Sequence, residues 1–232
     1  MSKKKVLFVT ESHNVASGFG TYAKQVLPRL AATGKYELAE FASYGDFNSV
    51  NNLDWLYLMH FQPDIVLTYR DPWMDQWIAQ SANRPYFHWV WMPTVDSAPQ
   101  QRKWLENFGE CDALLAYSEF GEKTLLEESN NKLNVIGCAS PGIDPKIYKP
   151  TASQRSLRKS LGVDLDINIV GTVMRNQKRK LFIELMRAFR IFLDKAPKEI
   201  ADKTCLYLHT SYPERSGWNI SQGVQEFNLQ GK

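Results

Sequence analysis

The chain has 232 residues, of which 44% are hydrophobic, 23% charged and 12% aromatic, with a net charge of +3 and three widely spaced cysteines. This composition is typical of a folded globular protein and excludes a disordered or collagen-like chain, while the odd cysteine count indicates neither a disulfide framework nor a metal site. No stretch reaches the ~18 apolar residues of a membrane span, and Val6–Val9 is too short for a signal peptide, so we expect a cytoplasmic protein without a transmembrane segment.

Short apolar runs alternate with helix-length amphipathic segments through the first 139 residues. Val6–Thr10 predicts a buried strand, and after a loop over 11–18 a helix begins near Phe19 and ends at Gly34. Further strands are expected at 36–43, 64–69, 86–92, 113–117 and 133–139, and further helices at 50–60, 72–81, 99–108 and 119–128. Strands joined by such helices pair in parallel, so the sequence predicts an α/β fold with a doubly wound, Rossmann-like sheet.

Residues 144–154 interrupt this alternation. Pro145, Pro150 and several polar residues predict a linker, so we expect one domain over 1–150 and a second over 151–232. The second is expected to contain a helix at 156–161, a buried strand at 167–174, a helix at 181–195, a strand at 205–210 and a helix near Ile220. Two strands are too few for a closed Rossmann-like domain, so we interpret 151–232 as the beginning of a truncated second one.

Positive charge is concentrated in this second domain. Residues 1–150 contain 14 Lys and Arg against 17 Asp and Glu, whereas residues 151–232 contain 14 against 8. Arg175, Lys178, Arg179 and Lys180 lie between a strand and a helix N-terminus, where cations oppose the helix dipole unless they bind an anion. The donor fork of Arg175 and the point charge of Lys180 suit a diphosphate, and a solvated basic loop is the alternative.

A glycine-rich loop precedes the first helix. Gly18-Phe-Gly20-Thr-Tyr-Ala23 matches a permissive dinucleotide-binding pattern, in which glycines let backbone amides approach a phosphate. In a dinucleotide site the glycines follow the strand directly, whereas here about seven residues intervene. The pattern therefore predicts a loop over the carboxyl edge of the sheet, with a purely structural turn as the alternative.

Four segments together resemble the retaining GT-B glycosyltransferases of group 1, also called family 4. They are the Gly18-Phe-Gly20-Thr-Tyr loop, Asp112-Ala-Leu-Leu-Ala-Tyr-Ser118, Pro141-Gly142-Ile143-Asp144 followed by Tyr148 and Pro150, and Arg175-Asn-Gln-Lys-Arg-Lys180. The resemblance implies a GT-B type fold with an acceptor-side N-terminal domain, a C-terminal domain that binds the donor, and a cleft between them. It also implies a hexosyltransferase whose co-substrate is a nucleotide-diphosphate sugar, with an unknown acceptor and with neither a metal nor another cofactor.

The same resemblance assigns roles to the residues of the basic and glycine-rich loops. Arg175 and Lys180 would neutralise the donor diphosphate as it leaves, and Gly18 and Gly20 would bring backbone amides near the same phosphates.

Candidates on the acceptor or sugar side lie in the N-terminal domain. Family members often have a histidine near the reacting sugar, and this neighbourhood contains His88 within an aromatic strand and Asp96 after it. We favour Asp96 as the catalytic group, because a histidine in such a strand is more often a core residue. Ser118 and Gly142 are further candidates, and helix capping is the alternative for Asp96 and Ser118.

One feature of the family is missing from this sequence. Group 1 enzymes usually carry two glutamates, separated by seven residues, well beyond the equivalent of Thr210. Glu119 and Glu127 have that spacing but lie on an N-terminal-domain helix, where two carboxylates about two turns apart are ordinary surface residues. The donor site is therefore expected to be incomplete, and the chain alone is expected to bind weakly or to be inactive.

Three other functions compete with this interpretation. A non-catalytic nucleotide- or sugar-binding half-module would keep the fold without turnover. A nicotinamide-dependent oxidoreductase would use the Gly18 loop with Asp46, but the loop spacing argues against it. Nucleic-acid binding would use Tyr212 and Trp218 as stacking surfaces, but four cations in one loop suit a diphosphate better, so we expect no nucleic-acid partner.

Overall fold

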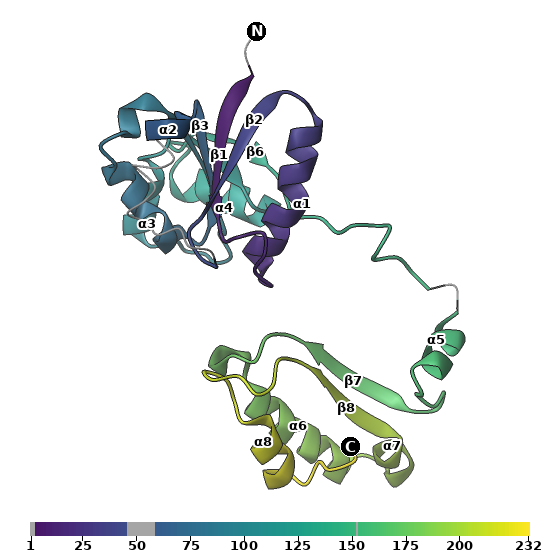
Figure 1. The fold of residues 1–232 in the computed structure, drawn as a ribbon. Helices are drawn as coiled ribbons and strands as arrows, with labels where there is room; N and C mark the ends of the chain where they lie inside the picture. Colours follow the sequence, from purple (N-terminus) through teal and green to yellow (C-terminus); the bar gives the residue numbers. More distant parts are fainter. Residues whose placement is uncertain (1–2, 46–58, 152) are drawn as a thin grey trace. The chain divides into compact units, whose positions relative to one another are not determined.

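The computed structural model describes residues 3–45, 59–151 and 153–232. The chain divides into two compact units, Met1–Asp144 and Pro145–Lys232, here called unit 1 and unit 2 (Figure 1). Within the described residues, no helix combines the length and hydrophobicity needed to span a bilayer. The same residues contain no group of three or more His, Cys, Asp or Glu side chains placed to hold a metal ion.

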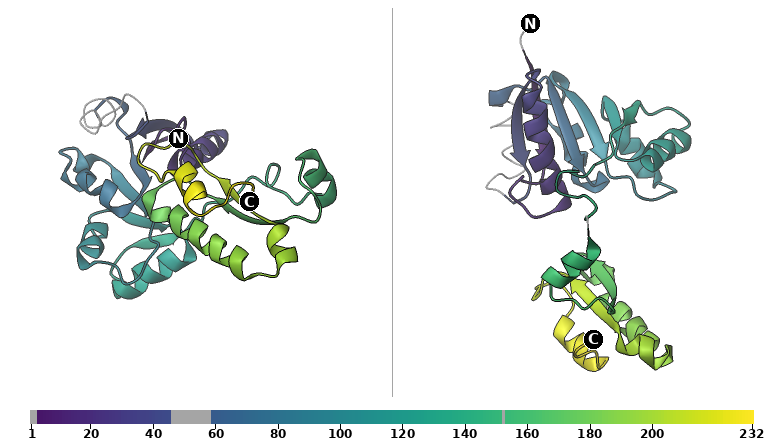
Figure 2. Two further views of the ribbon diagram at one scale, coloured as in Figure 1. Left: turned by 90° about the horizontal axis from the view of Figure 1, so that it is seen from below. Right: turned by 90° about the vertical axis from the view of Figure 1, so that its right-hand side faces the viewer.

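Unit 1 is built on a parallel sheet of six strands in the order β2-β1-β3-β4-β5-β6. The strands are β1 (Lys4–Thr10), β2 (Tyr36–Ala42), β3 (Ile65–Arg70), β4 (His88–Pro93), β5 (Ala113–Ala116) and β6 (Val135–Cys138). This arrangement confirms the predicted doubly wound sheet, and Figures 1 and 2 show its strands running side by side with helices against them.

Unit 1 has a hydrophobic core on each face of its sheet. The helices are α1 (Gly18–Ala32), α2 (Met59–Phe61), α3 (Arg102–Phe108) and α4 (Glu119–Glu128). Side chains along a strand alternate between faces. Leu7 and Val9 of β1 therefore join one buried cluster with Trp91, whereas Phe8 joins another with Ala23 of α1.

The segment 72–81 is not the helix that its pattern predicts. It forms short 3₁₀ turns at Pro72–Met74 and Gln76–Gln80, and a third follows at Arg84–Tyr86. Asp75, between the first two turns, is fully buried and pairs with Arg70. This contact draws the chain against the sheet in the middle of the predicted helix. Most of the helix predicted over 50–60 lies outside the described residues, as does Asp46.

The strand order locates the edge of the sheet at which ligands bind in this class of fold. From β1 the chain moves outward to β2 and then returns to β3 on the other side of β1. The carboxyl ends of β1 and β3 therefore border the crevice that parallel α/β sheets use for ligands. The loops after β1, β3, β4 and β5 all belong to this carboxyl edge.

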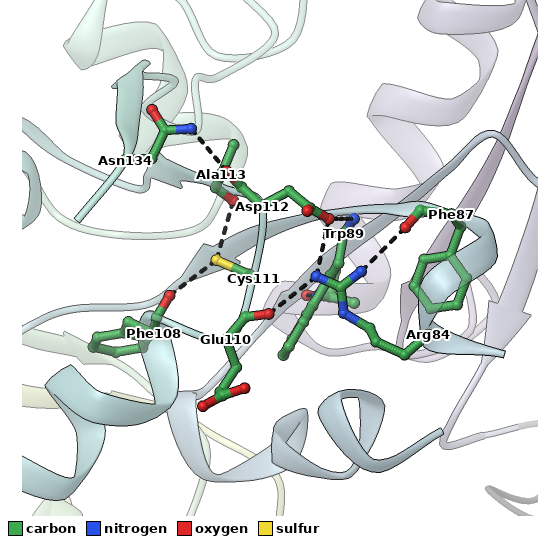
Figure 3. Close-up of polar contacts among 10 residues, drawn as sticks. Arg84, Phe87, Trp89, Phe108, Glu110, Cys111, Asp112, Ala113 and Asn134 are labelled. Carbon is green, nitrogen blue, oxygen red and sulfur yellow. Dashed lines mark hydrogen bonds and ion pairs between the residues drawn. The ribbon is translucent and has the colours of Figure 1, made fainter. Parts of the chain in front are cut away.

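Asp112 organises the opposite, amino edge of the sheet (Figure 3). Its carboxylate accepts a hydrogen bond from the Trp89 amide at 2.6 Å and pairs with Arg84 at 2.9 Å. Arg84 also donates to two backbone carbonyls at 3.1 and 3.0 Å. In the neighbouring Cys111, burial raises the thiol pKa to about 12, so this thiol is no nucleophile at neutral pH. The Asp112 segment thus stabilises the start of β4 and β5.

Unit 2 contains two parallel strands, β7 (Asn168–Val173) and β8 (Thr204–His209). Its helices are α5 (Gln154–Ser160), α6 (Phe182–Lys195), α7 (Lys198–Asp202) and α8 (Ile220–Glu226). Met186 and Phe189 of α6 pack with Leu206 and Leu208 of β8, and α6 and α8 lie on the same side of the strand pair (Figures 1 and 2). The five-residue α7 is absent from the predictions because it is too short to show a helical period.

The prediction that β7 is buried is wrong. Ile169, Val170 and Val173 are 42%, 43% and 77% exposed. A continuous apolar run is typical of a parallel strand covered on both faces. Among the described residues of unit 2, however, β7 pairs with β8 alone, and the buried cluster lies on the α6 face.

Candidate functional site

The loop after β1 is packed tightly against the start of α1. Ser17 caps the helix, because its Oγ accepts a hydrogen bond from the Gly20 amide at 3.0 Å, and the same hydroxyl donates to Glu11. A Cβ on Gly20 would lie 2.5 Å from the carbonyl oxygen of Val15, so only glycine fits there. Gly18 is exposed and has open space beside it. Local packing thus explains why residue 20 is a glycine, and the Ser17 hydroxyl accepts its amide hydrogen. Gly18 remains accessible to a ligand.

Tyrosines gather at the carboxyl ends of β3 and β5, beside α1. The ring of Tyr69 lies 4.2 Å from that of Tyr22 and stacks on Tyr117 at 5.9 Å, measured between centroids. Burial raises the pKa of Tyr22 and of Tyr69 above the ordinary value of 10.0, and the neighbouring tyrosines add to the shift at Tyr69. These two hydroxyls therefore stay protonated and neutral at physiological pH.

A buried ion pair closes the carboxyl end of β3. Arg70, which is 3% exposed, pairs with the fully buried Asp75 and donates to the Ser43 hydroxyl after β2. Burial raises the pKa of Asp75 to about 6, although the charge of Arg70 opposes the shift. Among the described residues, Nε of Arg70 and Oδ2 of Asp75 have no hydrogen-bond partner. The pair fixes the loops after β2 and β3 to each other.

Asp96 lies at the carboxyl edge, whereas His88 lies at the amino edge. Asp71, directly after β3, accepts a hydrogen bond from the Thr94 hydroxyl directly after β4, and Asp96 follows, exposed. Asp96 caps no helix, because α3 has Gln101 at its N-cap. His88 is the first residue of β4 and is exposed, so its interpretation as a core residue is wrong. The first position of a strand lies outside the packed middle of the sheet. The prediction failed because the aromatic residues around His88 suggested a core position.

Ser118 has a structural explanation, whereas Gly142 makes no close contact within the described residues that requires a glycine. Ser118 is the N-cap of α4, and its Oγ accepts a hydrogen bond from the Gly121 amide at 3.0 Å. Gly142 is exposed in the segment after β6. Two residues later the Asp144 carboxylate lies 3.7 Å from the guanidinium of Arg29, in the last turn of α1. Helix capping alone therefore explains Ser118, and the Asp144 ion pair attaches the segment to α1.

In unit 2 a buried asparagine joins the two loops that follow the strands. Asn176 is fully buried, and its side chain accepts from the Trp218 amide at 2.8 Å and donates to the Trp218 carbonyl at 2.9 Å. A Cβ on Gly217 would lie 2.6 Å from the carboxamide carbon of Asn176, so the two loops are in close contact. Residues 174–181 and 210–219 therefore form one body at the carboxyl edge of β7 and β8, here called the paired loops.

The paired loops present cations and a single, partly buried carboxylate. Nε of Arg175 lies 3.5 Å from Oε2 of Glu214, which also accepts from the Ser211 hydroxyl at 3.2 Å. The Arg175 side chain is 63% exposed, so solvent screens this ion pair. Nζ of Lys178 lies 4.0 Å from the ring centroid of Trp218, whose Nε1 donates to the Lys178 carbonyl at 3.1 Å.

Lys180 is the last residue of a 3₁₀ turn and is half-buried. Leu181 then adopts a left-handed conformation with φ of 52°, and α6 begins at the fully buried Phe182. The cations thus lie in the loop ahead of the helix and outside its first turn. Arg175 and Lys180 share this loop in unit 2, whereas the other predicted site residues belong to unit 1.

Asn176 and Glu214 were not predicted from the sequence. Asn176 lies within the segment that carries the family resemblance, but an asparagine in a polar loop gives no sign of burial. No spacing pattern connects Glu214 to Arg175. The signal that was available is topological, because loops after neighbouring parallel strands meet at the same edge of a sheet.

No model of a known protein family matches the sequence, and no curated protein matches it. Solved structures match its fold. A putative UDP-N-acetylglucosamine 2-epimerase from Listeria monocytogenes is 13% identical with a TM-score of 0.63, covering 100% of this chain and 67% of its own. α,α-Trehalose 6-phosphate synthase from Burkholderia multivorans is 12% identical with a TM-score of 0.63, and the match covers 100% of this chain and 69% of its own. An S. aureus MnaA structure with UDP is 11% identical with a TM-score of 0.63, and the match covers 97% of this chain and 65% of its own.

These similarities confirm the predicted fold class. The chain has the Rossmann-like α/β architecture of GT-B type, glycosyltransferase-like proteins, and it spans about two thirds of the length of the structures that it matches. Identities of 11% to 13% show the fold alone.

Proposed function

We propose that this chain belongs to a cytoplasmic, retaining glycosyltransferase of the group 1, family 4 type, which transfers a hexose from a nucleotide-diphosphate sugar to an acceptor. In this proposal unit 1 is the acceptor-side domain and unit 2 is part of the donor-side domain. The observation that carries the proposal is the cationic loop 175–180, which Asn176 fixes at the carboxyl edge of two parallel strands. The fold is one in which matching structures are named for sugar-nucleotide chemistry.

The proposed role of the loop is to hold the leaving diphosphate. As the bond between sugar and phosphate breaks, negative charge grows on the diphosphate, and fixed cations stabilise that charge in the transition state without requiring a metal ion. Arg175 offers two parallel donors and Lys180 a point charge. The exposed contact between Arg175 and Glu214 is worth ~0–1 kcal/mol, so a diphosphate can replace the carboxylate.

Unit 1 supplies the other proposed groups. Asp96 is exposed at the carboxyl edge, where its carboxylate can accept a proton or hydrogen bond from an acceptor or sugar hydroxyl. The Gly18 amide is the proposed backbone contact to the donor phosphates, because the Gly20 amide is already bonded to Ser17. His88, at the amino edge, takes no part in the proposal.

Calorimetric titration of the full chain with UDP, GDP and NAD tests this function. We expect weak binding of at least one nucleoside diphosphate, which is lost when Arg175→Ala and Lys180→Ala are combined. The matched control combines Lys195→Ala and Lys198→Ala, which remove two exposed cations from the far end of α6 and from α7. Binding of NAD alone, or equal loss in both double variants, would contradict the proposal.

The second candidate function is an epimerase of sugar nucleotides, because one matching structure is named as a putative UDP-N-acetylglucosamine 2-epimerase. The two activities differ in product. A transferase releases the nucleoside diphosphate from a nucleotide sugar, whereas an epimerase changes the sugar while it remains attached to the nucleotide. Chromatography of UDP-N-acetylglucosamine incubated with the chain separates these outcomes, and binding without either product indicates a non-catalytic module.

A further inference from the structure

Two tryptophans form an unusual surface feature at the carboxyl edge of unit 1. Trp73 lies in the 3₁₀ turn directly after β3 and is 59% exposed. Its ring lies 6.1 Å from that of Trp104 in α3, at an interplanar angle of 39°. Trp104 packs against the main buried cluster of unit 1, so it supports Trp73 from beneath. Tryptophan is enriched at interfaces, because its ring offers a large apolar face and its N–H offers a hydrogen-bond donor.

The turn that carries Trp73 is held rigidly on both sides. Pro72 before it is buried, and the fully buried Asp75 after it pairs with Arg70. The Met74 carbonyl accepts a hydrogen bond from Nε1 of Trp77 at 2.9 Å. The exposure of Trp73 is therefore a property of a fixed turn, in which the backbone is anchored and the indole alone faces solvent. A rigid aromatic group of this kind binds a ligand at low entropic cost.

Hydrogen-bonding groups lie on the loop after β3, close in sequence to Trp73, and on the loop after β4. Asp71 and Thr94 bond to each other and join the loops after β3 and β4. Trp73 lies two residues beyond Asp71, and Asp96 lies two residues beyond Thr94. The two loops thus carry an indole and a carboxylate from a shared base at the carboxyl edge, which is the edge proposed for the acceptor.

We propose that Trp73, supported by Trp104, forms a stacking platform for a saccharide ring of the acceptor. Only the statement that the saccharide is the acceptor rests on the proposed function. The stacking of a sugar ring on Trp73 does not depend on it. The C–H face of a sugar ring packs on an indole, and its hydroxyls donate to nearby carboxylates. One exposed indole offers about the area of one sugar ring, well below the ~800 Å² per partner of a stable protein interface.

The test is a fluorescence and calorimetric titration of the full chain with neutral oligosaccharides, namely maltohexaose, cellohexaose and chitohexaose, without a nucleotide. At least one should quench tryptophan fluorescence, with affinity about tenfold lower in Trp73→Ala and partly retained in Trp73→Phe. The control is Tyr86→Ala, an aromatic that is 80% exposed and precedes β4 at the amino edge. UDP binding should be unchanged in all three variants.

Three outcomes would overturn the platform. They are no binding by any of the oligosaccharides, an equal loss of affinity in Tyr86→Ala and Trp73→Ala, and binding of a detergent micelle or an apolar peptide at Trp73 in place of sugar. Because the UDP titration reports on the Arg175–Lys180 loop and the saccharide titration on Trp73, loss of the saccharide site leaves the diphosphate proposal standing, and the reverse also holds.

Discussion

Unit 1 covers both faces of its parallel sheet, whereas unit 2 packs its strand pair on one face. In unit 1 the residues Val6–Val9 of β1 are at most 6% exposed, but in unit 2 Val173 of β7 is 77% exposed. β1 contains the continuous apolar run Val6–Val9, and β7 is apolar except at Asn168, Gly171 and Thr172. An apolar strand sequence therefore indicates a parallel strand but does not show how many layers cover it.

The carboxyl edges of the two units differ as well. In unit 1 the polar groups contact one another, as in the Ser17 cap on Gly20 and the buried pair of Arg70 and Asp75. In unit 2 a single buried residue, Asn176, fixes loops whose cations remain largely exposed. Unit 1 therefore offers aromatic and acidic groups, and unit 2 offers a positive site for an anion.

Replacing a core tryptophan should give the largest effect and should separate the units. Trp91 is fully buried, 4.8 Å from Trp89 and 5.0 Å from Phe108 between ring centroids. Trp91→Ala should lower the free energy of unfolding of unit 1 by about 3–5 kcal/mol. Hydrogen exchange should show lost protection in unit 1 alone. Val173→Ala, at an exposed position, should change stability by less than about 0.5 kcal/mol. Equal loss in both units would show that they unfold as one body.

The stability of unit 1 should fall as the pH rises past the pKa of Asp75. Burial raises this pKa to about 6 from the ordinary value of 3.8, so the folded state favours the protonated carboxyl. The protonated carboxyl therefore stabilises unit 1 fully below pH 3.8. This contribution to the free energy of unfolding, up to about 3 kcal/mol, is lost as the pH rises through 6. Denaturant unfolding between pH 4 and 7 should show this slope in the wild type and not in Asp75→Asn, and a slope of opposite sign would show that Arg70 dominates.

Removing the Asn176 side chain should loosen the paired loops. Asn176→Ala leaves the amide and carbonyl of Trp218 without their partner, at a cost of about 1–3 kcal/mol in unit 2. The Trp218 amide should lose hydrogen-exchange protection, and UDP affinity should fall although no cation has been removed. Gln225→Ala, at an exposed position of α8, is the control. Unchanged protection of Trp218 would mean that the loops hold their positions by other contacts.

Neutralising Glu214 should have the smallest effect, and it should be favourable. In Glu214→Gln the Arg175 guanidinium no longer has a carboxylate beside it, so an incoming diphosphate has no competitor. Calorimetry should show UDP affinity up to about fivefold higher, the range set by an exposed ion pair. Glu226→Gln, exposed at the end of α8, should leave the affinity unchanged. Weaker binding in Glu214→Gln would assign this carboxylate to the ligand itself.

Much of the fold follows from the sequence, because local signals agree with the packing. Helix α4 begins and ends where predicted, since Ser118 marks its start as a cap. The 72–81 segment fails because the burial of Asp75 against Arg70 is a tertiary contact that no local pattern records.

The candidate site was predictable in part. The Arg175–Lys180 segment was identified from its charge and position, but its geometry depends on Asn176 and Glu214, which contact a loop about 40 residues away in sequence. Gly20 stays a prediction as a ligand contact, and its tight fit against Val15 gives a local packing reason for the glycine. The residue types in the loop predicted anion-binding chemistry. The burial of each side chain and its contacts could be read only from the structure.

The most direct test of the central claim is the side-chain Nε–H signal of Arg175 in a ¹⁵N–¹H NMR spectrum during titration with UDP. We predict a progressive shift of this signal, absent when uridine replaces UDP, together with a shift of the Lys180 amide. If UDP shifts signals elsewhere in the chain while the Arg175 and Lys180 signals stay fixed, the paired loops are not the diphosphate site and the proposed function loses its support.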